Sequence, residues 1–429
     1  MRESFPLKGS LLRSPKQPVL ARDRDWYPYY AAFTEGFVSS VIESYLSDAT
    51  LVLDPWNGSG TTTSVCAQKG ISSIGIDINP ALTVIAKARL KVGECYESLG
   101  ELCNRIISEI TKRNKNEQPD DLLLHWMRPS SVSHIRAIQS AIHQCNTNGM
   151  DNCYSLDAIT RANSFDNTCC FSYCALFMSV RKLLQRFTTT NPTWFKEPAT
   201  IAQRIAPSEE LCLKVFVESF DRLRNLISKS RVSSSNARFL TQDSQRLPFG
   251  DGEIDGVITS PPYATRIDYV KGVLPELAVL GADRGFLTKL RQDSLGTPVV
   301  RGYNQKLPSN LSSKYGIETL KHIRDHSSKG SPSYYFPWIN KYFFNLEESI
   351  KEIARVVRSD GYICIVVRDS YYKEFLIDLQ QIVTEIMQNL NRKLEKRKDY
   401  GISPQSPSVK QTKENENFRL PKESLLIFR

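Results

Sequence analysis

The sequence predicts an α/β protein built on a three-layer, doubly wound and mostly parallel sheet with a helical insertion. Short apolar runs of strand length alternate with longer segments whose apolar residues recur at helical spacing. Several runs stop at an acid, a glycine turn or a proline pair, and the carboxyl ends of parallel strands are where such sheets bind ligands. From about residue 91 to 236 helical patterns dominate, so an insertion is expected there.

Composition limits the class of protein. The 429-residue chain has an ordinary apolar fraction of 41%, which suits two domains or one large core with insertions. It has no run of about 18 apolar residues, so no membrane span is expected. The N-terminus lacks the apolar segment of a secretory signal, and we expect a cytoplasmic protein. The net charge of +10 favours a polyanionic partner.

The ten cysteines include no C-x-x-C pair. Cys169, Cys170 and Cys174 lie in an apolar run that is typical of a helix core. A zinc site combining this cluster with Cys145 and Cys153 is the alternative, but the spacing matches no known zinc pattern. Reduced thiols and no bound metal are therefore predicted.

The first 25 residues are rich in Pro, Ser and Arg and predict an extended arm. An aromatic cluster over 26–33 follows, and it includes Tyr30 and Phe33. These aromatic rings either pack in the core or form a face for a flat ligand. Apolar residues at helical spacing then predict a helix over 37–45.

Two predicted strands, 50–54 and 73–77, each end in an aspartate. A turn with Gly58 and Gly60 follows the first strand, and glycines there let the backbone approach a ligand closely. The turn is not a phosphate-binding loop, because no Lys-Ser or Lys-Thr follows, and it lacks the third glycine of the dinucleotide pattern. Asp77 is well placed to accept hydrogen bonds from ribose hydroxyls, which favours a nucleoside-binding half-site over a purely structural βαβ unit.

The sheet is predicted to resume with a strand over 237–244, which carries Asp243, and another over 254–258. The latter runs directly into Thr-Ser-Pro-Pro-Tyr at 259–263. Two consecutive prolines lack backbone N–H groups and fix their own φ, so a rigid, extended loop is expected. The loop carries the hydroxyl of Ser260 before the prolines and an aromatic ring after them. An ordinary strand-ending turn is the alternative.

Further alternation of elements is predicted beyond this loop. The segment 282–341 has more basic than acidic residues, interleaved with aromatics, and is either a nucleic-acid contact or a solvated loop. The elements expected after it are a helix over 343–357, a turn over 358–361, a strand over 362–367, a helix over 375–390, a basic loop and a strand over 425–428.

Taken together, these motifs resemble those of the S-adenosylmethionine-dependent amino-methyltransferases of DNA, the modification methylases of restriction–modification systems. The matching motifs are Asp54-Pro55-x-x-Gly58-Ser59-Gly60-Thr61-Thr62, Asp77-Ile78-Asn79-Pro80, Asp243 and Thr259-Ser260-Pro261-Pro262-Tyr263. The resemblance covers about 1–90 and 237–429 and says little about the helical insertion. It implies the Rossmann-like class I methyltransferase fold, with a seven-stranded sheet.

The resemblance also implies roles for individual residues. S-adenosylmethionine is the implied cofactor, and the residues implied to bind it are Tyr30, Phe33, Asp54, Pro55, Trp56, Gly58, Gly60, Thr61, Asp77, Ile78, Asp243 and Ser244. Within this set, Asp77 takes the ribose hydroxyls and Asp243 lies at the adenine amine. The implied catalytic residues are Ser260, Pro261, Pro262 and Tyr263. Trp56 departs from the family pattern, in which Phe or a small residue is more usual.

The chemistry of amine methylation explains the residue types in the loop. An exocyclic amine is a poor nucleophile because its lone pair is delocalised into the ring. Hydrogen bonds to Ser260 and to the Pro261 carbonyl would hold the nitrogen toward tetrahedral geometry, with its lone pair aimed at the methyl group. Tyr263 can stack on the base, which must flip out of a duplex to reach such a pocket. Methylation at cytosine C5 needs a Pro-Cys nucleophile, and no such dipeptide occurs in the chain.

The target of methylation stays open between several alternatives. In the family, Ser-Pro-Pro-Tyr goes mostly with cytosine N4 and Asp-Pro-Pro-Tyr mostly with adenine N6. Site-specific methylation of cytosine N4 in double-stranded DNA is therefore expected, with adenine N6 as the alternative. The pairs Asp268-Tyr269 and Glu276-Leu277 also resemble RNA methyltransferases that act on guanine N2 of tRNA. A non-catalytic nucleic-acid-binding module is disfavoured, because the acids and the serine of the motifs are all present.

The expected organisation has five parts. They are an arm with the first part of the core over 1–90, a mostly helical insertion over 91–236 as a candidate target-recognition region, a core segment with the Ser-Pro-Pro-Tyr loop over 237–281, a basic and aromatic insertion over 282–341 as a candidate DNA contact, and the rest of the core over 342–429. The implied partners are double-stranded DNA and a cognate restriction endonuclease or another defence component, and no membrane.

Overall fold

The computed structural model describes residues 12, 14–15, 26–29, 33–90, 96–110, 121–146, 157–189, 194–227, 236–265, 267–298, 311–401 and 421–429. Two residues singled out from the sequence, Tyr30 and Cys153, lie outside the described residues. Most of the basic segment that was expected to be a loop after residue 390 lies outside them as well.

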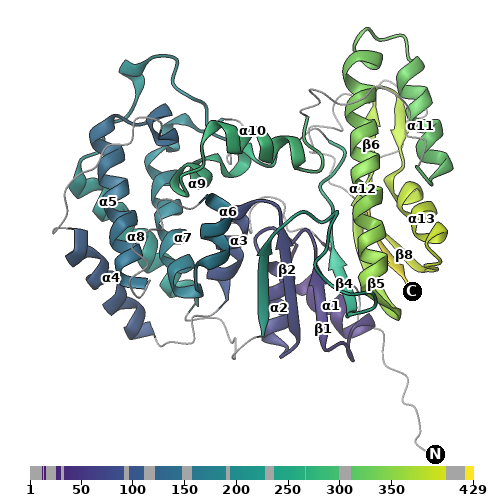
Figure 1. The fold of residues 1–429 in the computed structure, drawn as a ribbon, viewed down its shortest axis with the longest axis horizontal. Helices are drawn as coiled ribbons and strands as arrows, with labels where there is room; N and C mark the ends of the chain where they lie inside the picture. Colours follow the sequence, from purple (N-terminus) through teal and green to yellow (C-terminus); the bar gives the residue numbers. More distant parts are fainter. Residues whose placement is uncertain are drawn as a thin grey trace, which may run out of the picture.

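A seven-stranded sheet forms the centre of the fold (Figure 1). Its strands are β1 (Leu51–Asp54), β2 (Ser72–Asp77), β3 (Ala237–Thr241), β4 (Ile254–Thr259), β5 (Val357–Arg368), β8 (Leu394–Gly401) and β9 (Lys422–Phe428). The strand order is β3-β2-β1-β4-β5-β9-β8. Strand β9 runs antiparallel to both of its neighbours, and the other neighbouring pairs are parallel. The predicted doubly wound, mostly parallel sheet of the Rossmann-like class is confirmed.

Helices cover both faces of the sheet, so the fold has three layers (Figure 1). One layer contains α1 (Glu35–Tyr45), α2 (Thr61–Gln68) and α3 (Pro80–Arg89), and the other contains α11 (Lys314–Asp325), α12 (Phe336–Val356) and α13 (Leu379–Asn389). Two helices follow β4: α9 (Leu274–Val279) packs against α7, and α10 (Arg284–Asp293) extends from it toward the top of the sheet in Figure 1. Among the residues that the structure describes, no helix is long and apolar enough to cross a membrane.

Alternation along the central strands gives the sheet two buried faces, as expected for strands with helices on both sides. In β5, Ile363, Ile365 and Val367 pack into the core shared with α12 and α13. Cys364 and Val366 point the other way, into the core shared with α1 and α2. The near-continuous apolar run that predicted this strand is therefore explained by burial of both faces of the strand.

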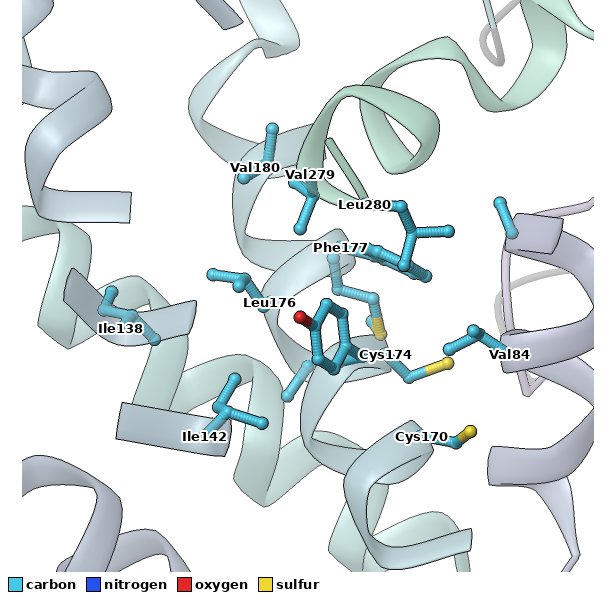
Figure 2. Close-up of a cluster of buried hydrophobic side chains, with 14 of the residues drawn as sticks. Val84, Ile138, Ile142, Cys170, Cys174, Leu176, Phe177, Val180, Val279 and Leu280 are labelled. Atoms are coloured by element: carbon cyan, nitrogen blue, oxygen red, sulfur yellow. The ribbon is translucent and has the colours of Figure 1, made fainter. Parts of the chain in front are cut away.

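A second body of helices packs beside the sheet, on the left in Figure 1. Its members are α4 (Tyr96–Ile110), α5 (Pro129–Asn146), α6 (Ala158–Ser164), α7 (Asn167–Leu183) and α8 (Glu209–Ile227). Helix α7 lies at its centre and contacts α3, α5, α8 and α9. Figure 2 shows this packing, with Cys170, Cys174, Leu176, Phe177 and Val180 of α7 among Val84, Ile138, Ile142, Val279 and Leu280.

Two side-chain cations link these helices to one another and to α3 of the sheet layer. The Lys87 ammonium of α3 donates to the carbonyls of Ala162 (2.8 Å) and Phe165 (3.0 Å) at the end of α6. The Arg136 guanidinium of α5 pairs with the buried Asp121 at 2.6 Å and donates to the carbonyl of Val279 at 2.7 Å. These bonds satisfy helix-end carbonyls that would otherwise be buried without partners.

The structure corrects two expectations in the C-terminal part of the chain. The predicted turn over 358–361 belongs to β5, which continues through it with a register shift against β4. The start of the predicted helix over 375–390 is a short hairpin, β6 (Ser370–Tyr372) with β7 (Phe375–Ile377), and α13 begins only after it. Lys373, with a left-handed backbone (φ 55°), lies in the turn of this hairpin, and pairing with β6 places the first three residues of the expected helix in β7.

Two further segments differ from the sequence expectation. The basic stretch after α13, expected as a loop, begins with the edge strand β8, which exists because it pairs with β9. Its exposed Lys396 and Arg397 are the kind of charges that protect an edge strand from further pairing. The segment 282–341, for which a solvated loop was one interpretation, contains α10 and α11.

Gly60 illustrates how tightly the first strand-to-helix turn packs. It precedes α2 with φ +81°, and a Cβ atom at this position would lie 2.8 Å from the Ala86 Cβ and 3.0 Å from the Ala86 Cα of α3. Gly70, at the other end of α2, has a similar φ of +72° but no atom within 4 Å of such a Cβ. A substitution at either glycine would strain the backbone, but only a substitution at Gly60 would also crowd a neighbouring helix.

We expect Gly60→Ala to destabilise the protein more than Gly70→Ala does. The left-handed conformation costs an alanine about 1 kcal/mol at either position, and crowding against α3 adds about 1–3 kcal/mol at Gly60 alone. Urea unfolding followed by circular dichroism measures both free energies. Equal losses in the two variants would show that α3 moves away without cost.

Candidate active site

The residues singled out from the sequence gather at one edge of the sheet. Asp54 ends β1 and Asp77 ends β2, while Asp243 follows β3 by two residues. Ser260 is the first residue after β4, and Arg368 ends β5. Because these strands are parallel, their carboxyl ends meet at the same edge, where doubly wound sheets bind ligands.

A cavity of about 600 Å³ opens at this edge, and its volume is within the usual range for small-molecule sites. Eleven of the predicted site residues line it, namely Pro55, Trp56, Gly58, Asp77, Ile78, Asp243, Ser244, Ser260, Pro261, Pro262 and Tyr263. The cavity thus brings the predicted cofactor half-site and the Ser-Pro-Pro-Tyr loop into one space.

The remaining predicted residues lie elsewhere. Phe33, Asp54 and Thr61 line a much smaller cavity of about 30 Å³, which shares Trp56 and Ser260 with the large one. Gly60 lines neither of these two cavities, and its place in the structure is the close approach of α2 to α3. Tyr30 lies outside the described residues, but its neighbour Tyr29 lines the large cavity.

Asp54 joins three elements through its buried carboxylate, which is 3% exposed. Its Oδ1 accepts hydrogen bonds from Thr259 Oγ1 (2.6 Å) and the Trp56 N–H (3.2 Å), and its Oδ2 accepts one from Thr62 Oγ1 (2.6 Å). Burial raises the pKa of Asp54 to about 6, although these hydrogen bonds oppose the shift. The carboxylate therefore fixes the ends of β1 and β4 and the start of α2 relative to one another.

Asp77 holds the glycine turn in place. Its Oδ2 accepts a hydrogen bond from the Gly58 N–H at 3.0 Å, and its Oδ1 accepts one from the Asn79 N–H at 2.9 Å. Burial raises the pKa of Asp77 to about 7, against the effect of these two bonds. Gly58 has φ +53°, and a Cβ atom there would lie 3.3 Å from the Tyr29 ring, so a side chain would crowd the wall of the cavity.

Asp243 and Ser244 contribute the β3 side of the cavity. The Asp243 Oδ1 accepts a hydrogen bond from the Gln245 N–H at 3.0 Å. The Gln245 side-chain amide also lies 3.1 Å from Asp243 Oδ2. Ser244 is buried, with its hydroxyl 2.9 Å from the Ser349 hydroxyl of α12. The loop after β3 is thereby anchored to the opposite layer.

The Ser-Pro-Pro-Tyr loop is held by residues distant in sequence. The Tyr342 hydroxyl of α12 donates to the Pro262 carbonyl at 2.8 Å. The Tyr263 hydroxyl donates to Glu423 Oε1 of β9 at 2.6 Å, and its N–H donates to the Tyr269 hydroxyl at 3.2 Å. Burial, with the negative charge of Glu423, raises the pKa of Tyr263 well above its usual value. The tyrosine is thus neutral, with one ring edge fixed.

Several further residues of this edge were not among the predicted cofactor-binding or catalytic residues. Those that line the large cavity are Tyr29, Asn79, Leu82, Thr265, Ile267, Tyr269, Val270, Asp293, Ser294, Leu295 and Arg368. Glu423 belongs with them through Tyr263. Arg368 directly follows a predicted strand, and this position at the carboxyl end could have identified it as a site residue. The residues around Glu423 contain no comparable pattern.

Metal binding finds no support in the described part of the chain, where no three His, Cys, Asp or Glu side chains are grouped suitably for an ion. Cys170 and Cys174 are buried in α7. Burial raises the pKa of the Cys170 thiol to about 12, so the thiol stays protonated at neutral pH.

The acids behind the RNA alternative have structural partners. Asp268 is buried, pairs with Arg291 at 2.5 Å and accepts from the Lys271 N–H at 3.1 Å. Glu276 is also buried and accepts hydrogen bonds from Tyr27 and Arg181. Neither acid lines the large cavity.

Comparison with known proteins adds a family. A family model for DNA methylase, of the N6/N4 methyltransferase class, matches residues 13–88. The Type II methyltransferase M.BsoBI of Geobacillus stearothermophilus is 27% identical over 307 residues, 64% of this chain and 56% of that protein. The Type II methyltransferase M.AvaI of Nostoc sp. is 24% identical over 396 residues, 86% of this chain and 79% of that protein.

The chain is therefore similar in sequence to DNA methylases and to Type II methyltransferases. The family match runs from the arm through α3 and so includes Asp54, the glycine turn and Asp77. This match supports S-adenosylmethionine as the cofactor. The alignment with M.BsoBI spans little more than half of that protein.

A solved structure from Methanosarcina mazei, described as an S-adenosylmethionine-dependent methyltransferase, aligns with 90% of this chain and 95% of its own. Its identity is 10% and its TM-score is 0.28. A likeness this weak adds nothing to the strand order, on which the fold assignment rests.

We expect Asp54→Asn to stabilise the unliganded protein increasingly as the pH rises. The folded pKa of about 6 exceeds the unfolded value near 3.8. The folded state therefore holds the proton longer, and stability is lost as the pH rises through this window. The asparagine amide can keep the contacts to Thr259 and Thr62 without a charge, so the variant should gain up to about 3 kcal/mol at neutral pH.

Urea unfolding at several pH values measures this difference, and Asp255→Asn is the matched control. At Asp255, burial raises the pKa, but hydrogen bonds from Thr50 and Leu51 outweigh it and the pKa is lowered. That variant should lose stability relative to the parent as the pH rises. A pH-independent difference for Asp54→Asn would contradict the assigned burial cost.

Proposed function

We propose that the protein transfers a methyl group from S-adenosylmethionine to the exocyclic N4 amine of a flipped cytosine in double-stranded DNA. The observation that carries the proposal is that one cavity holds Asp77, Asp243 and the Ser-Pro-Pro-Tyr loop together. In the reaction, the nitrogen–carbon bond forms as the carbon–sulfur bond breaks, and the amine then releases one proton. The chain supplies orientation and hydrogen bonds rather than a covalent nucleophile.

The cofactor would lie over β1, β2 and β3. Asp77 would accept hydrogen bonds from the ribose hydroxyls with the lone pairs not used by Gly58 and Asn79. Asp243, on the neighbouring strand, would accept one from the adenine amine. The glycine turn between β1 and α2 lets the backbone approach the methionine part closely. These acids also suit the positive charge of the sulfonium.

The target amine would lie at the end of β4. Ser260 Oγ and the Pro261 carbonyl would accept its two hydrogens, so that the lone pair points toward the methyl group. Ser260 lines both cavities and lies 3.5 Å from the Tyr263 hydroxyl, at the outer limit of a hydrogen bond. Holding the reactants in such a geometry is worth up to about 7–11 kcal/mol of the barrier.

The target base must leave the duplex to reach this cavity, and Tyr263 would stack on it, a contact worth about 1–3 kcal/mol. We propose that the helical insertion over 91–236 contributes to target recognition and the segment 282–341 to DNA contact, helped by the net charge of +10. A cognate restriction endonuclease as partner is proposed from the family alone.

Serine rather than aspartate before the two prolines favours cytosine over adenine. The alternative product is N6-methyladenine, and nucleoside mass spectrometry of DNA and RNA from cells that express the protein distinguishes the two. N4-methylcytosine in DNA supports the proposal. N6-methyladenine alone, or modification confined to RNA, contradicts it.

We expect Ser260→Ala to lower N4-methylcytosine formation by about 100-fold or more, because the amine loses one of the two acceptors that orient it. Binding of S-adenosylmethionine, measured by isothermal titration calorimetry, should stay unchanged. Ser39→Ala, in the exposed part of α1, is the control for handling. Full activity of the Ser260 variant would refute its role.

Asp77→Ala should weaken binding of S-adenosylmethionine about tenfold or more, which corresponds to about 1.4 kcal/mol. The reason is loss of the carboxylate that receives the ribose hydroxyls. Asp48→Ala, at an exposed carboxyl outside the cavity, is the matched control. An unchanged dissociation constant would exclude Asp77 from the cofactor site.

The pH dependence separates a cofactor contact from damage to the turn. Since the pKa of Asp77 is about 7, the parent protein should bind the cofactor more tightly at pH 8 than at pH 6, as the ionised carboxylate is the better acceptor. The alanine variant should lose this pH dependence.

A further inference from the structure

The half of the cavity at the carboxyl ends of β4 and β5 contains a charged residue that the proposed reaction has not used. Arg368 ends β5, and its direct partner in the antiparallel register is Glu423 near the start of β9. Glu423 is 4% exposed and accepts the hydrogen bond of the Tyr263 hydroxyl. The strand register therefore places Arg368 beside the last residue of the Ser-Pro-Pro-Tyr loop.

A second connection places Arg368 at the same point. The Tyr263 N–H donates to the Tyr269 hydroxyl, and both tyrosines line the cavity together with Arg368. Burial raises the pKa of Tyr269 to about 12, and the positive charge of Arg368 opposes this rise. The guanidinium thus lies close enough to Tyr269 to act on its ionisation.

At the strand ends, charge is ordered along the edge of the sheet, while a further acid that lines the cavity, Asp293, ends α10. Asp77 and Asp243 follow β2 and β3, on the side where the cationic cofactor is proposed to bind. Arg368 lies on the other side of β4, and among the described residues that line the cavity it is the one basic side chain. Thr265 Oγ1 is buried in the same half, without a hydrogen-bond partner among the described residues. This half is therefore equipped for a ligand with hydrogen-bond acceptors.

A flipped cytosine presents such acceptors next to its amine. Its N3 and O2 follow N4 along one edge, and a guanidinium can donate to two neighbouring acceptors at once. Adenine offers N1 beside its amine, but a C–H group takes the place of O2. A donor pair aimed at this edge therefore discriminates between the two bases.

We propose that Arg368 is a specificity-determining residue that donates to N3 and O2 of the target cytosine while the amine is held at Ser260. The inference rests on the proposed function, because it names what recognises the base at the same site. It accounts for a half-buried arginine across the cavity from Asp77 and Asp243, and for its cross-strand pairing with the residue that anchors Tyr263.

The test compares two duplexes that carry a site mapped by sequencing DNA methylated by the parent protein. One duplex has the target cytosine, and the other has adenine in its place. Arg368→Gln should lower the ratio of the cytosine rate to the adenine rate about tenfold or more under single-turnover conditions, since it removes a two-point contact that only cytosine completes. Binding of S-adenosylmethionine should stay within about twofold, because the cofactor half is untouched.

The controls keep the outcomes distinct. Arg358→Gln alters an arginine at the opposite end of β5 and should leave the ratio unchanged. Arg368→Lys keeps the charge but not the paired donors, so the ratio should fall in it as well, and it decides the matter if the glutamine variant fails to fold. Equal losses on both duplexes would indicate a phosphate contact and overturn the inference, as would a parental ratio in either folded variant. A parent protein that makes no N4-methylcytosine contradicts the proposed function itself.

Discussion

The geometry of the candidate active site depends on one buried carboxylate. Asp54 ends β1 and accepts hydrogen bonds of 2.6 Å from both Thr259 and Thr62. Thr259 ends β4 immediately before the Ser-Pro-Pro-Tyr loop, and Thr62 lies in the first turn of α2, beyond the glycine turn. Burial raises the pKa of Asp54 to about 6, so its ionised form is costly, but removing an acceptor would leave buried hydroxyls unpaired. The network therefore sets how far the glycine turn lies from the loop.

The cavity has two halves, one on each side of the pair formed by β1 and β4. The strand order turns outward in both directions from the β1–β4 pair, which makes this pair the topological switch point of the sheet. Asp77 and Asp243 occupy one side, and Arg368 occupies the other. Under the proposed function, a cationic methyl donor and an acceptor-rich base would each lie on the side of opposite charge, with Ser260 between them. The topology would then order the two substrates along this edge.

The sequence was sufficient for features that are local to a strand end, and it failed where pairing is distant. The strands ending at Asp54, Asp77 and Thr259 were predictable because apolar runs stop abruptly at acids, glycines or prolines. Strand β8 was not, since its basic residues become a strand only by pairing with β9. The role of Glu423 could not be predicted for the same reason, because the Tyr263 that it binds lies 160 positions away in the sequence. The first three residues of the helix expected from 375 form β7 instead, because they pair with β6, and the spacing of apolar residues does not show this pairing.

The loop after β4 is held more rigidly than its two prolines alone require. The Tyr342 hydroxyl holds the Pro262 carbonyl at 2.8 Å, and Glu423 holds the Tyr263 hydroxyl at 2.6 Å. Transfer to an amine needs no change of charge on any of these residues, so orientation is the main contribution that the chain can make. A displacement of about 1 Å can cost roughly 100-fold in rate when orientation dominates. The contacts from α12 and β9 therefore act together with those of Asp54 in β1. All of them restrict the position of Ser260, which would face the methyl donor in the proposed reaction.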